Sequence, residues 1–140
     1  MKEVSFKRVR SWSDVIPKWL KDKSARKYLP IGENIRKWIW YNNNSNSKLY
    51  FIFRYHIRVG FIQIEKNNEY YDIAILVDRR FRRQHLATKS LKKLRDIYHE
   101  GTFRMSVQQC NSAMHNVLDN LNYVASDLNE FDSFTYISSN

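Results

Sequence analysis

Residues 77–88 read Val77-Asp78-Arg79-Arg80-Phe81-Arg82-Arg83-Gln84-His85-Leu86-Ala87-Thr88, and they join a strand-like run to a helical one. Residues 71–77 are rich in strand-forming side chains, and from Gln84 onward the apolar residues recur at helical spacing. The first N–H groups of a helix have no intrahelical acceptor, and the helix dipole adds positive potential there. Together with the four arginines, this predicts a site for a multiply charged anion such as a pyrophosphate.

Apolar periodicity divides the rest of the chain into strands and helices. We expect a strand at 4–9, helices at 11–20 and 33–40, strands at 49–53, 59–64 and 71–77, a helix from 84, a strand at 103–107, a helix at 111–121, and strands at 123–124 and 131–137. The three strands between residues 49 and 77 are expected to form an antiparallel meander, and a helix precedes each of the next two strands. This order predicts an α+β (α/β/α) fold with a mixed, mostly antiparallel sheet of about six to seven strands, flanked on both faces by about four helices.

Length and composition limit the class of protein. The 140 residues, 43% of them hydrophobic, are enough for one domain with a core of ordinary size, which we place at residues 1–140. No run approaches the roughly 18 apolar residues of a membrane span, and no secretory signal is visible, so a cytoplasmic location is expected. Cys110 is the only cysteine, which excludes an internal disulfide and fits a reducing compartment.

The charge and the remaining motifs narrow the chemistry. A net charge of +10 suits nucleic acid, an anionic membrane surface or a phosphorylated ligand. The four histidines have no spacing with Cys or carboxylates that would suggest a metal site, so no metal is expected. The four tryptophans stand at core-like helical positions and are interpreted as core residues, with an aromatic binding platform as the alternative: Trp12, Trp19, Trp38 and Trp40.

Spacing within the basic stretch resembles that of a known family. Residues 82–87 read R-x-x-H-x-A, which is similar to the Q/R-x-x-G-x-G/A pyrophosphate loop of the GCN5-related N-acetyltransferases. Val77 stands five residues before Arg82, as does the apolar residue that ends the family's fourth strand. A second pattern of the family falls on Asn111, Met114, Leu118 and Tyr123. The resemblance covers about residues 49–137.

This resemblance implies an acetyl-CoA-dependent N-acetyltransferase with the acyl-CoA N-acyltransferase fold, which transfers acetyl directly to a primary amine. Residues 1–47 would form the acceptor side and residues 48–140 the cofactor-binding core. The edge of Leu76 and Val77 would pair with the pantetheine arm, and Asn111 would contact that arm. The pyrophosphate of acetyl-CoA would be held by the side chains of Arg82 and Arg83 and by the backbone N–H groups of Gln84, His85, Leu86, Ala87 and Thr88.

Three positions depart from the family pattern. His85 replaces the first glycine of the loop, and Asn122 replaces the glycine of a Gly-Phe pair. Asn tolerates the left-handed conformation better than most residues, so the second change is mild. Leu118 stands where many relatives carry the tyrosine that protonates the departing thiolate, so that role is vacant or filled elsewhere.

Candidate catalytic residues each have a plainer interpretation. Asp72 is a general base, an acceptor anchor or a solvent-facing strand carboxylate. His115 replaces the missing tyrosine or is a histidine on the rim of a helix. His56 relays a proton or merely occupies a turn. Cys110 would support an acyl-cysteine route only with a paired base, and a small buried cysteine is the favoured interpretation.

The acceptor and the partners stay open. Residues 24–47 carry Arg26, Lys27, Arg36 and Lys37, and such a basic lining suits a phosphate-bearing acceptor. Residues 34–39 loosely resemble members that acetylate nucleotide-linked amino sugars; other small amines or a protein N-terminus remain alternatives. A nucleic-acid-binding module using Arg79–Arg83 is the less favoured class, and a CoA-binding homologue without turnover is a third. The oligomeric state is a monomer or a homodimer.

Overall fold

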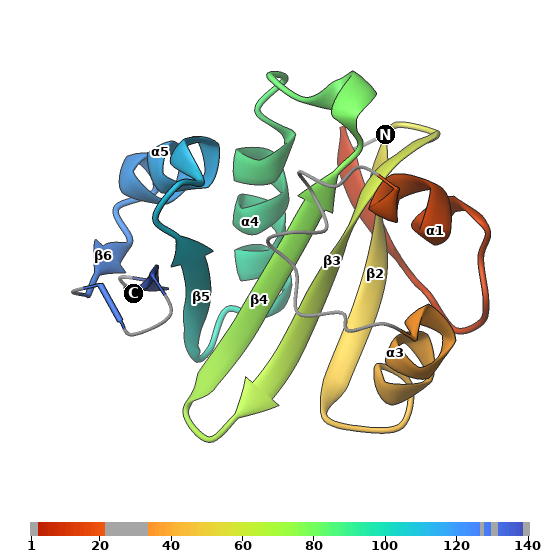
Figure 1. Cartoon of the computed structure of the whole chain (residues 1–140), viewed down its shortest axis with the longest axis horizontal. Coiled ribbons are helices and arrows are strands. Elements are labelled where there is room, and N and C mark those ends of the chain that lie inside the picture. The colour runs from red at the N-terminus through yellow and green to blue at the C-terminus, as the bar shows by residue number, and fades with distance from the viewer. Residues whose placement is uncertain (1–2, 22–33, 127, 130–131, 139–140) are drawn as a thin grey trace.

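A computed structural model describes residues 3–21, 34–126, 128–129 and 132–138 (Figure 1). Within these residues, seven strands form one sheet in the order β1-β2-β3-β4-β5-β7-β6. Their bounds are β1 Val4–Arg8, β2 Ser47–Arg54, β3 Ile57–Asn67, β4 Tyr70–Val77, β5 Thr102–Gln108, β6 Val124–Ala125 and β7 Ser133–Ile137. Neighbouring strands are antiparallel except β4 and β5, which are parallel. The prediction of a mixed, mostly antiparallel sheet is confirmed.

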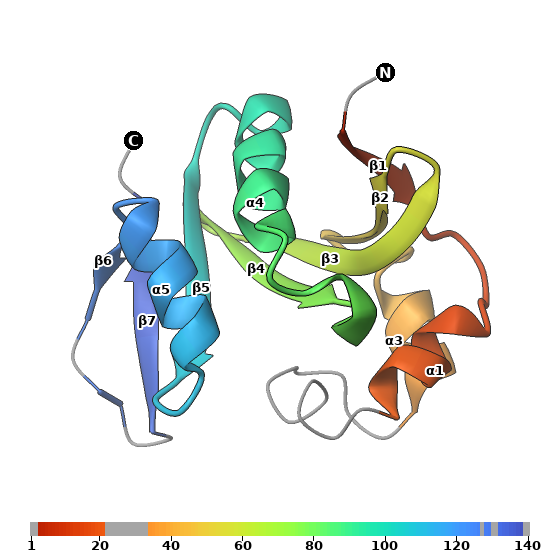
Figure 2. The same ribbon diagram turned by 90° about the horizontal axis from the view of Figure 1, so that it is seen from above.

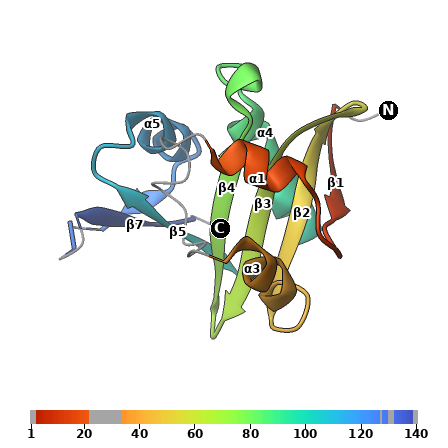
Figure 3. The same ribbon diagram turned by 45° about the vertical axis from the view of Figure 1, so that its right-hand side comes forward.

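Helices cover both faces of the sheet. The helices are α1 Val15–Leu20, α3 Ile35–Tyr41, the 3₁₀ turn η1 Arg79–Phe81, α4 Leu86–Ile97 and α5 Ser112–Asn120. Figure 3 shows α1 and α3 in front of β2, β3 and β4, with α4 behind them, and Figure 2 shows the same separation from above. The order of strands and helices agrees with the one expected from periodicity.

Two apolar clusters fill the spaces between the layers. One lies under α4 and α5 and contains Ile62, Ile64, Ile73 and Ile75. The other lies under α1 and α3 and contains Leu49, Phe51, Phe61 and Leu76. Because successive strand residues point to opposite faces, β3 and β4 contribute to both clusters in alternation. The apolar runs of these strands are therefore explained by burial on two sides.

The Asn-rich segment ends α3 in a specific way. The last carbonyls of a helix have no intrahelical donor. Here the four residues that follow α3 supply side-chain donors to carbonyls four positions earlier: Asn42 to Trp38, Asn43 to Ile39, Asn44 to Trp40 and Ser45 to Tyr41, at 2.8, 3.0, 2.9 and 2.8 Å. Residues 42–45 thus form a C-terminal cap for α3, and the chain then enters β2 at Ser47.

Three burial predictions are wrong. Trp12 is 37% exposed and Trp40 62% exposed, whereas Trp19 and Trp38 are buried. Trp12 precedes the first turn of α1, and Trp40 lies on the outward face of α3, so neither reaches the sheet. Cys110 is also exposed, because it lies in the turn between β5 and α5 and not in a packed element. In the described part of the chain, no helix is long and apolar enough to cross a membrane.

Candidate cofactor and acceptor site

The parallel strands β4 and β5 separate after a short paired segment. Their register pairs are Tyr70 with Thr102, Tyr71 with Phe103 and Asp72 with Arg104. Beyond Asp72 the two strands diverge (Figure 1). The β5-facing edge of β4 from Ile73 to Val77 is therefore not paired with β5. This places Leu76 and Val77 on an open strand edge, which can receive an extended ligand arm.

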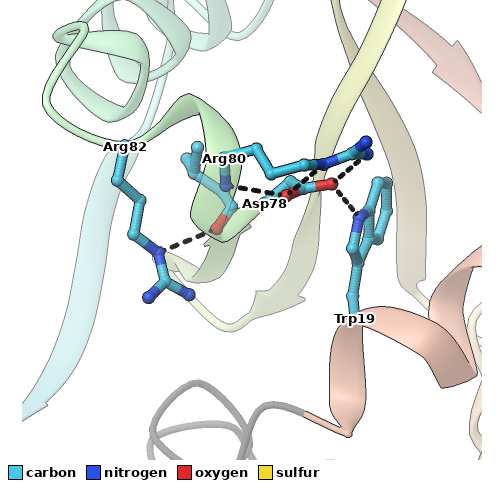
Figure 4. Close-up of polar contacts among 5 residues, drawn as sticks. Trp19, Asp78, Arg80 and Arg82 are labelled. Atoms are coloured by element: carbon cyan, nitrogen blue, oxygen red, sulfur yellow. Dashed lines mark hydrogen bonds and ion pairs between the residues drawn. The ribbon is translucent and has the colours of Figure 1, made fainter.

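A buried carboxylate fixes the turn at the end of β4. Asp78 is 6% exposed and caps η1 by accepting a hydrogen bond from the backbone N–H of Arg80 at 2.9 Å. Its Oδ2 also accepts from Trp19 Nε1 of α1 at 2.8 Å and from Arg80 Nη2 at 2.9 Å (Figure 4). The Arg80 hydrogen bonds lower the pKa of Asp78 to about 2, against the opposing effect of burial. Asp78 thus joins the basic turn to α1.

The stability contribution of Asp78 should depend on pH. A lowered pKa in the folded state means that the contribution is present above about pH 4 and is lost as the pH falls toward 2. Arg80 is largely exposed, so solvent screening reduces the expected difference to about 1–2 kcal/mol. Comparing the unfolding free energies of the parent and Asp78→Asn between about pH 6 and pH 2.5 should show a gap that narrows in acid. A gap that stays constant would contradict this assignment.

The loop before α4 has a backbone that glycine would favour. Arg83 and His85 have positive φ angles of 66° and 59°, in the left-handed region. This explains why the related loops carry glycine where this chain has His85; His tolerates the region better than most residues. His85 is the N-cap of α4, yet its side chain makes no capping hydrogen bond. The first backbone N–H groups of α4, those of Leu86, Ala87 and Thr88, therefore have no acceptor within the helix and none in the side chain of His85.

Cations surround this helix start. Arg82 and Arg83 are exposed, and Arg82 Nε donates to the carbonyl of Val77 at 3.1 Å, which ties the loop back to β4 (Figure 4). Arg54 of β2 donates to Gln84 Oε1 at 2.6 Å and also pairs with Glu3. The arrangement brings Arg82 to Thr88 together at one end of the open β4 edge. It combines backbone donors with exposed positive charge, which suits a pyrophosphate.

A cleft of about 610 Å³ lies on the face of the sheet that carries α3. Its polar lining comes from alternate residues of three strands: Gln63, Glu65 and Asn67 of β3, Asp72 of β4, and Arg104, Ser106 and Gln108 of β5. Asn111, Met114, Trp38 and Tyr41 also line it. Asn111 reaches it from the N-terminus of α5, where its side chain accepts from Met114 N at 3.4 Å. Cleft and loop thus lie along the same strand, β4.

Asp72 is held in a charged network within this cleft. Both of its oxygens accept from Arg104, at 2.6 and 2.9 Å, and Oδ2 also accepts from Asn67 at 2.6 Å. Burial opposes ionisation, but the bonds from Arg104 and Asn67 outweigh it, and the pKa of Asp72 is lowered. A carboxylate with a lowered pKa is a weaker base. The geometry favours the anchoring role of Asp72 over the role of general base.

His115 has both ring nitrogens engaged. Nε2 lies 2.9 Å from the carbonyl of Gln108, and Nδ1 lies 2.7 Å from the hydroxyl of Tyr136. A carbonyl only accepts, so Nε2 carries a proton and donates to the carbonyl of Gln108. This arrangement braces α5 against β5 and β7. For His115 to act as an acid, one of these bonds would have to break.

Other expected site residues are placed as follows. Leu118 is fully buried in the α4–α5 cluster, so the position of the family's tyrosine is apolar here. Asn122 has a φ of 63°, which confirms the left-handed conformation expected where relatives carry glycine. His56 is exposed in the turn between β2 and β3. Arg36 stacks on Trp12 at 3.9 Å and lines a separate groove, while Arg26 and Lys27 lie outside the described residues.

Sequence reasoning gave no role to Asp78, Arg104 or Gln63. Asp78 could have been noticed as a lone acid between a buried strand and a run of arginines. Gln63 interrupts the apolar run 59–64, which is a signal for a polar group inside a sheet. Nothing in the sequence indicated Arg104, because its pairing with Asp72 depends on the parallel register of β4 and β5.

The splayed strands, the basic loop and the helix start define an acyl-CoA N-acyltransferase fold. A family model described as Acetyltransferase (GNAT) family matches residues 12–123, and the chain belongs to this family. In the part of the chain described, no three His, Cys, Asp or Glu residues gather as metal ligands.

Comparison of whole structures supports the same fold. One similar structure is an acetyl transferase from Salmonella typhimurium, described as modifying the N-terminal serine of ribosomal protein L7/L12. It is 18% identical to this chain, with a TM-score of 0.78, and the match covers 98% of this chain and 95% of the Salmonella typhimurium chain. The Campylobacter jejuni N-acetyltransferase PseH, in complex with acetyl coenzyme A, is 13% identical with a TM-score of 0.71, covering 96% of each chain. A domain from Methanocaldococcus jannaschii is 14% identical with a TM-score of 0.74, also covering 96% of each chain. No curated protein sequence matches the chain.

Proposed function

We propose that the protein is an acetyl-CoA-dependent N-acetyltransferase that transfers acetyl directly to a primary amine. The observation that carries the proposal is the open edge of β4, which runs from the cleft to a loop with two left-handed residues and a helix N-terminus. The N–H groups of residues 84–88, with Arg82 and Arg83, hold the pyrophosphate. Leu76 and Val77 pair with the pantetheine arm, and Asn111 faces it from α5.

The transfer follows from this placement. The neutral amine attacks the thioester carbon, a C–N bond forms, the C–S bond breaks, and CoA leaves as the thiolate. A backbone N–H at the end of β4 stabilises the developing oxyanion. The proton lost by the amine passes to water in the cleft, since Asp72 is already paired with Arg104. With Leu118 buried, solvent also reprotonates the thiolate.

The acceptor is a polar primary amine. Amide, carboxylate and hydroxyl groups line the cleft, beside the aromatic side chains Trp38 and Tyr41. Such a lining suits a hydroxyl-rich molecule, and a nucleotide-linked amino sugar is the acceptor that we propose. Asp72, fixed by Arg104, anchors it. A protein N-terminus is the competing acceptor, by analogy with the Salmonella typhimurium structure.

Two measurements test the proposal. Acetyl-CoA and CoA should each raise the melting temperature, while ATP should not; if neither CoA species causes a shift, the cofactor assignment is wrong. CoA release should then be followed with a thiol reagent for UDP-glucosamine and for a short peptide with a free N-terminal serine. The exposed Cys110 also reacts with such reagents, so the Cys110→Ser variant supplies the low-background form of the assay.

A further inference from the structure

Gln63 lies in the middle of β3 on the floor of the cleft. It is 8% exposed, and in the strand register it stands opposite Ala74 of β4. Ala74 also lines the cleft and has only a methyl side chain. Leu76, which we propose pairs with the pantetheine arm, is two residues further along β4, or about 7 Å at the rise of an extended strand. Gln63 is therefore close to where the thioester would lie.

A chain of hydrogen bonds fixes which way the Gln63 amide points. Asn42 Nδ2 donates to the backbone carbonyl of Trp38 at 2.8 Å. A carbonyl only accepts, so Asn42 must direct its nitrogen toward α3 and its Oδ1 toward the sheet. Oδ1 accepts from the Ser47 hydroxyl and from Gln63 Nε2, the latter at 3.0 Å. Gln63 Nε2 also lies 3.3 Å from Ser47 Oγ.

The oxygen of Gln63 is left for another partner. Asn42 and Ser47 are fully buried, and the nitrogen end of Gln63 faces them. The opposite end of the amide is the carbonyl oxygen, to which no residue of the described chain donates a hydrogen bond. In contrast, the carboxylates of Glu65 and Asp72 on the same floor already accept from Tyr41 and Arg104. Gln63 Oε1 is thus an oriented, uncharged hydrogen-bond acceptor in the cleft.

We infer that Gln63 Oε1 accepts a hydrogen bond from the amine of the acetyl acceptor and so directs the lone pair of the amine nitrogen toward the thioester carbon. This inference depends on the proposed N-acetyltransferase function. A neutral carbonyl accepts from an N–H without taking its proton, so the amine stays nucleophilic. Asn42 is a positioning residue, because it sets the orientation of Gln63 without reaching the cleft. Specificity for a primary amine follows, since an alcohol or thiol has only one hydrogen to give and loses it on reaction.

Substitutions at Gln63 and Asn42 test this inference by steady-state kinetics, with UDP-glucosamine and the serine peptide as probes. Gln63→Met, which keeps the length but removes the carbonyl, should raise the KM for whichever amine is used by about tenfold. Asn42→Ala should raise it by a similar factor, although it touches no substrate. The Kd for CoA should change by less than about twofold in both, which separates acceptor binding from general damage.

The matched control is Asn43→Ala. Asn43 donates to a carbonyl of α3 at 3.0 Å, as Asn42 does, but makes no bond to Gln63. It should lose similar helix capping and leave the acceptor KM unchanged. If Gln63→Met leaves KM unchanged, or if Asn43→Ala raises it as much as Asn42→Ala, the inference is wrong.

A second readout does not require turnover. The side-chain NH₂ resonance of Gln63 in ¹⁵N-labelled protein, assigned by its loss in Gln63→Met, should shift when either probe is added in the presence of CoA. A shift without turnover would show that the amine binds at Gln63, but it would contradict the proposed function and with it the directing of the lone pair toward a thioester. Turnover without a resonance shift or a KM effect would support the proposed function and contradict the inference. If neither turnover nor a shift is observed, the proposed function and the inference are both wrong.

Discussion

Replacing Arg82 and Arg83 together by alanine is expected to weaken CoA binding by about a hundredfold or more. In the proposed site each guanidinium would make charge-assisted contacts to the pyrophosphate, and such bonds contribute about 1.5–3 kcal/mol apiece. Arg82 also ties the loop to the carbonyl of Val77 at 3.1 Å, so its loss should loosen the strand end that we propose receives the pantetheine arm. Isothermal titration with CoA measures the change, and the thermal shift caused by CoA should largely disappear.

The control must remove the same charge elsewhere. Lys7 of β1 and Lys92 of α4 are both exposed and lie outside the loop. Replacing both by alanine lowers the net charge equally, so it reports the general electrostatic attraction of a basic protein for CoA. We expect this variant to bind CoA within about threefold of the parent at 0.15 M salt. Equal losses in the two double variants would mean that Arg82 and Arg83 are not specific ligands.

Gly60→Ala is expected to destabilise the fold by about 3 kcal/mol or more. The added Cβ would overlap the carbonyl oxygen of Leu76 and lie 3.0 Å from the Cα of Val77. These are backbone atoms of the neighbouring strand, so the clash cannot be relieved by rotating a side chain. Chemical denaturation followed by tryptophan fluorescence measures the loss. Because Leu76 and Val77 form the proposed pantetheine edge, CoA binding should weaken in the same variant.

Gly101→Ala provides the comparison. Its φ of 90° is unfavourable for alanine, and the added Cβ would lie 2.7 Å from the ring of Tyr71, which is a side chain that can shift. We expect a cost of about 1–2 kcal/mol and no effect on CoA affinity. If Gly60→Ala proves no more costly than Gly101→Ala, the close approach of β3 to the end of β4 is not as tight as described.

Local patterns accounted for the elements and their order. The three β-rich runs became β2, β3 and β4, and the helical spacing after Gln84 became α4. Burial was less well predicted from the same patterns. Trp19 and Trp40 both stand at helical spacing in aromatic segments, yet only Trp19 packs on the sheet. Periodicity gives the relative angle of side chains around a helix but not which side faces the core, so exposure had to come from the packing.

Candidate site residues divide in the same way. The loop 82–88 could be proposed from the sequence because its chemistry is contiguous: the arginines and the start of a helix follow one another in the chain. The hydrogen-bond partners of Asp72 and His115 could not be predicted, because Arg104 lies 32 residues from Asp72 and Tyr136 lies 21 residues from His115. Contacts of this length are set by strand register, which one sequence does not encode in any local pattern.

The sequence by itself determined the alternation of strands and helices, the basic loop 82–88 and its likeness to a family of acetyltransferases, because each depends on residues within a turn or two of one another. Tertiary structure alone decided that β4 and β5 separate beyond Asp72, that Asp78 binds Trp19 across 59 positions, and that Asn42 orients Gln63. The physical reason is that a buried polar group must satisfy its hydrogen bonds with whatever the fold brings near it. Those partners become known only when the layers are packed.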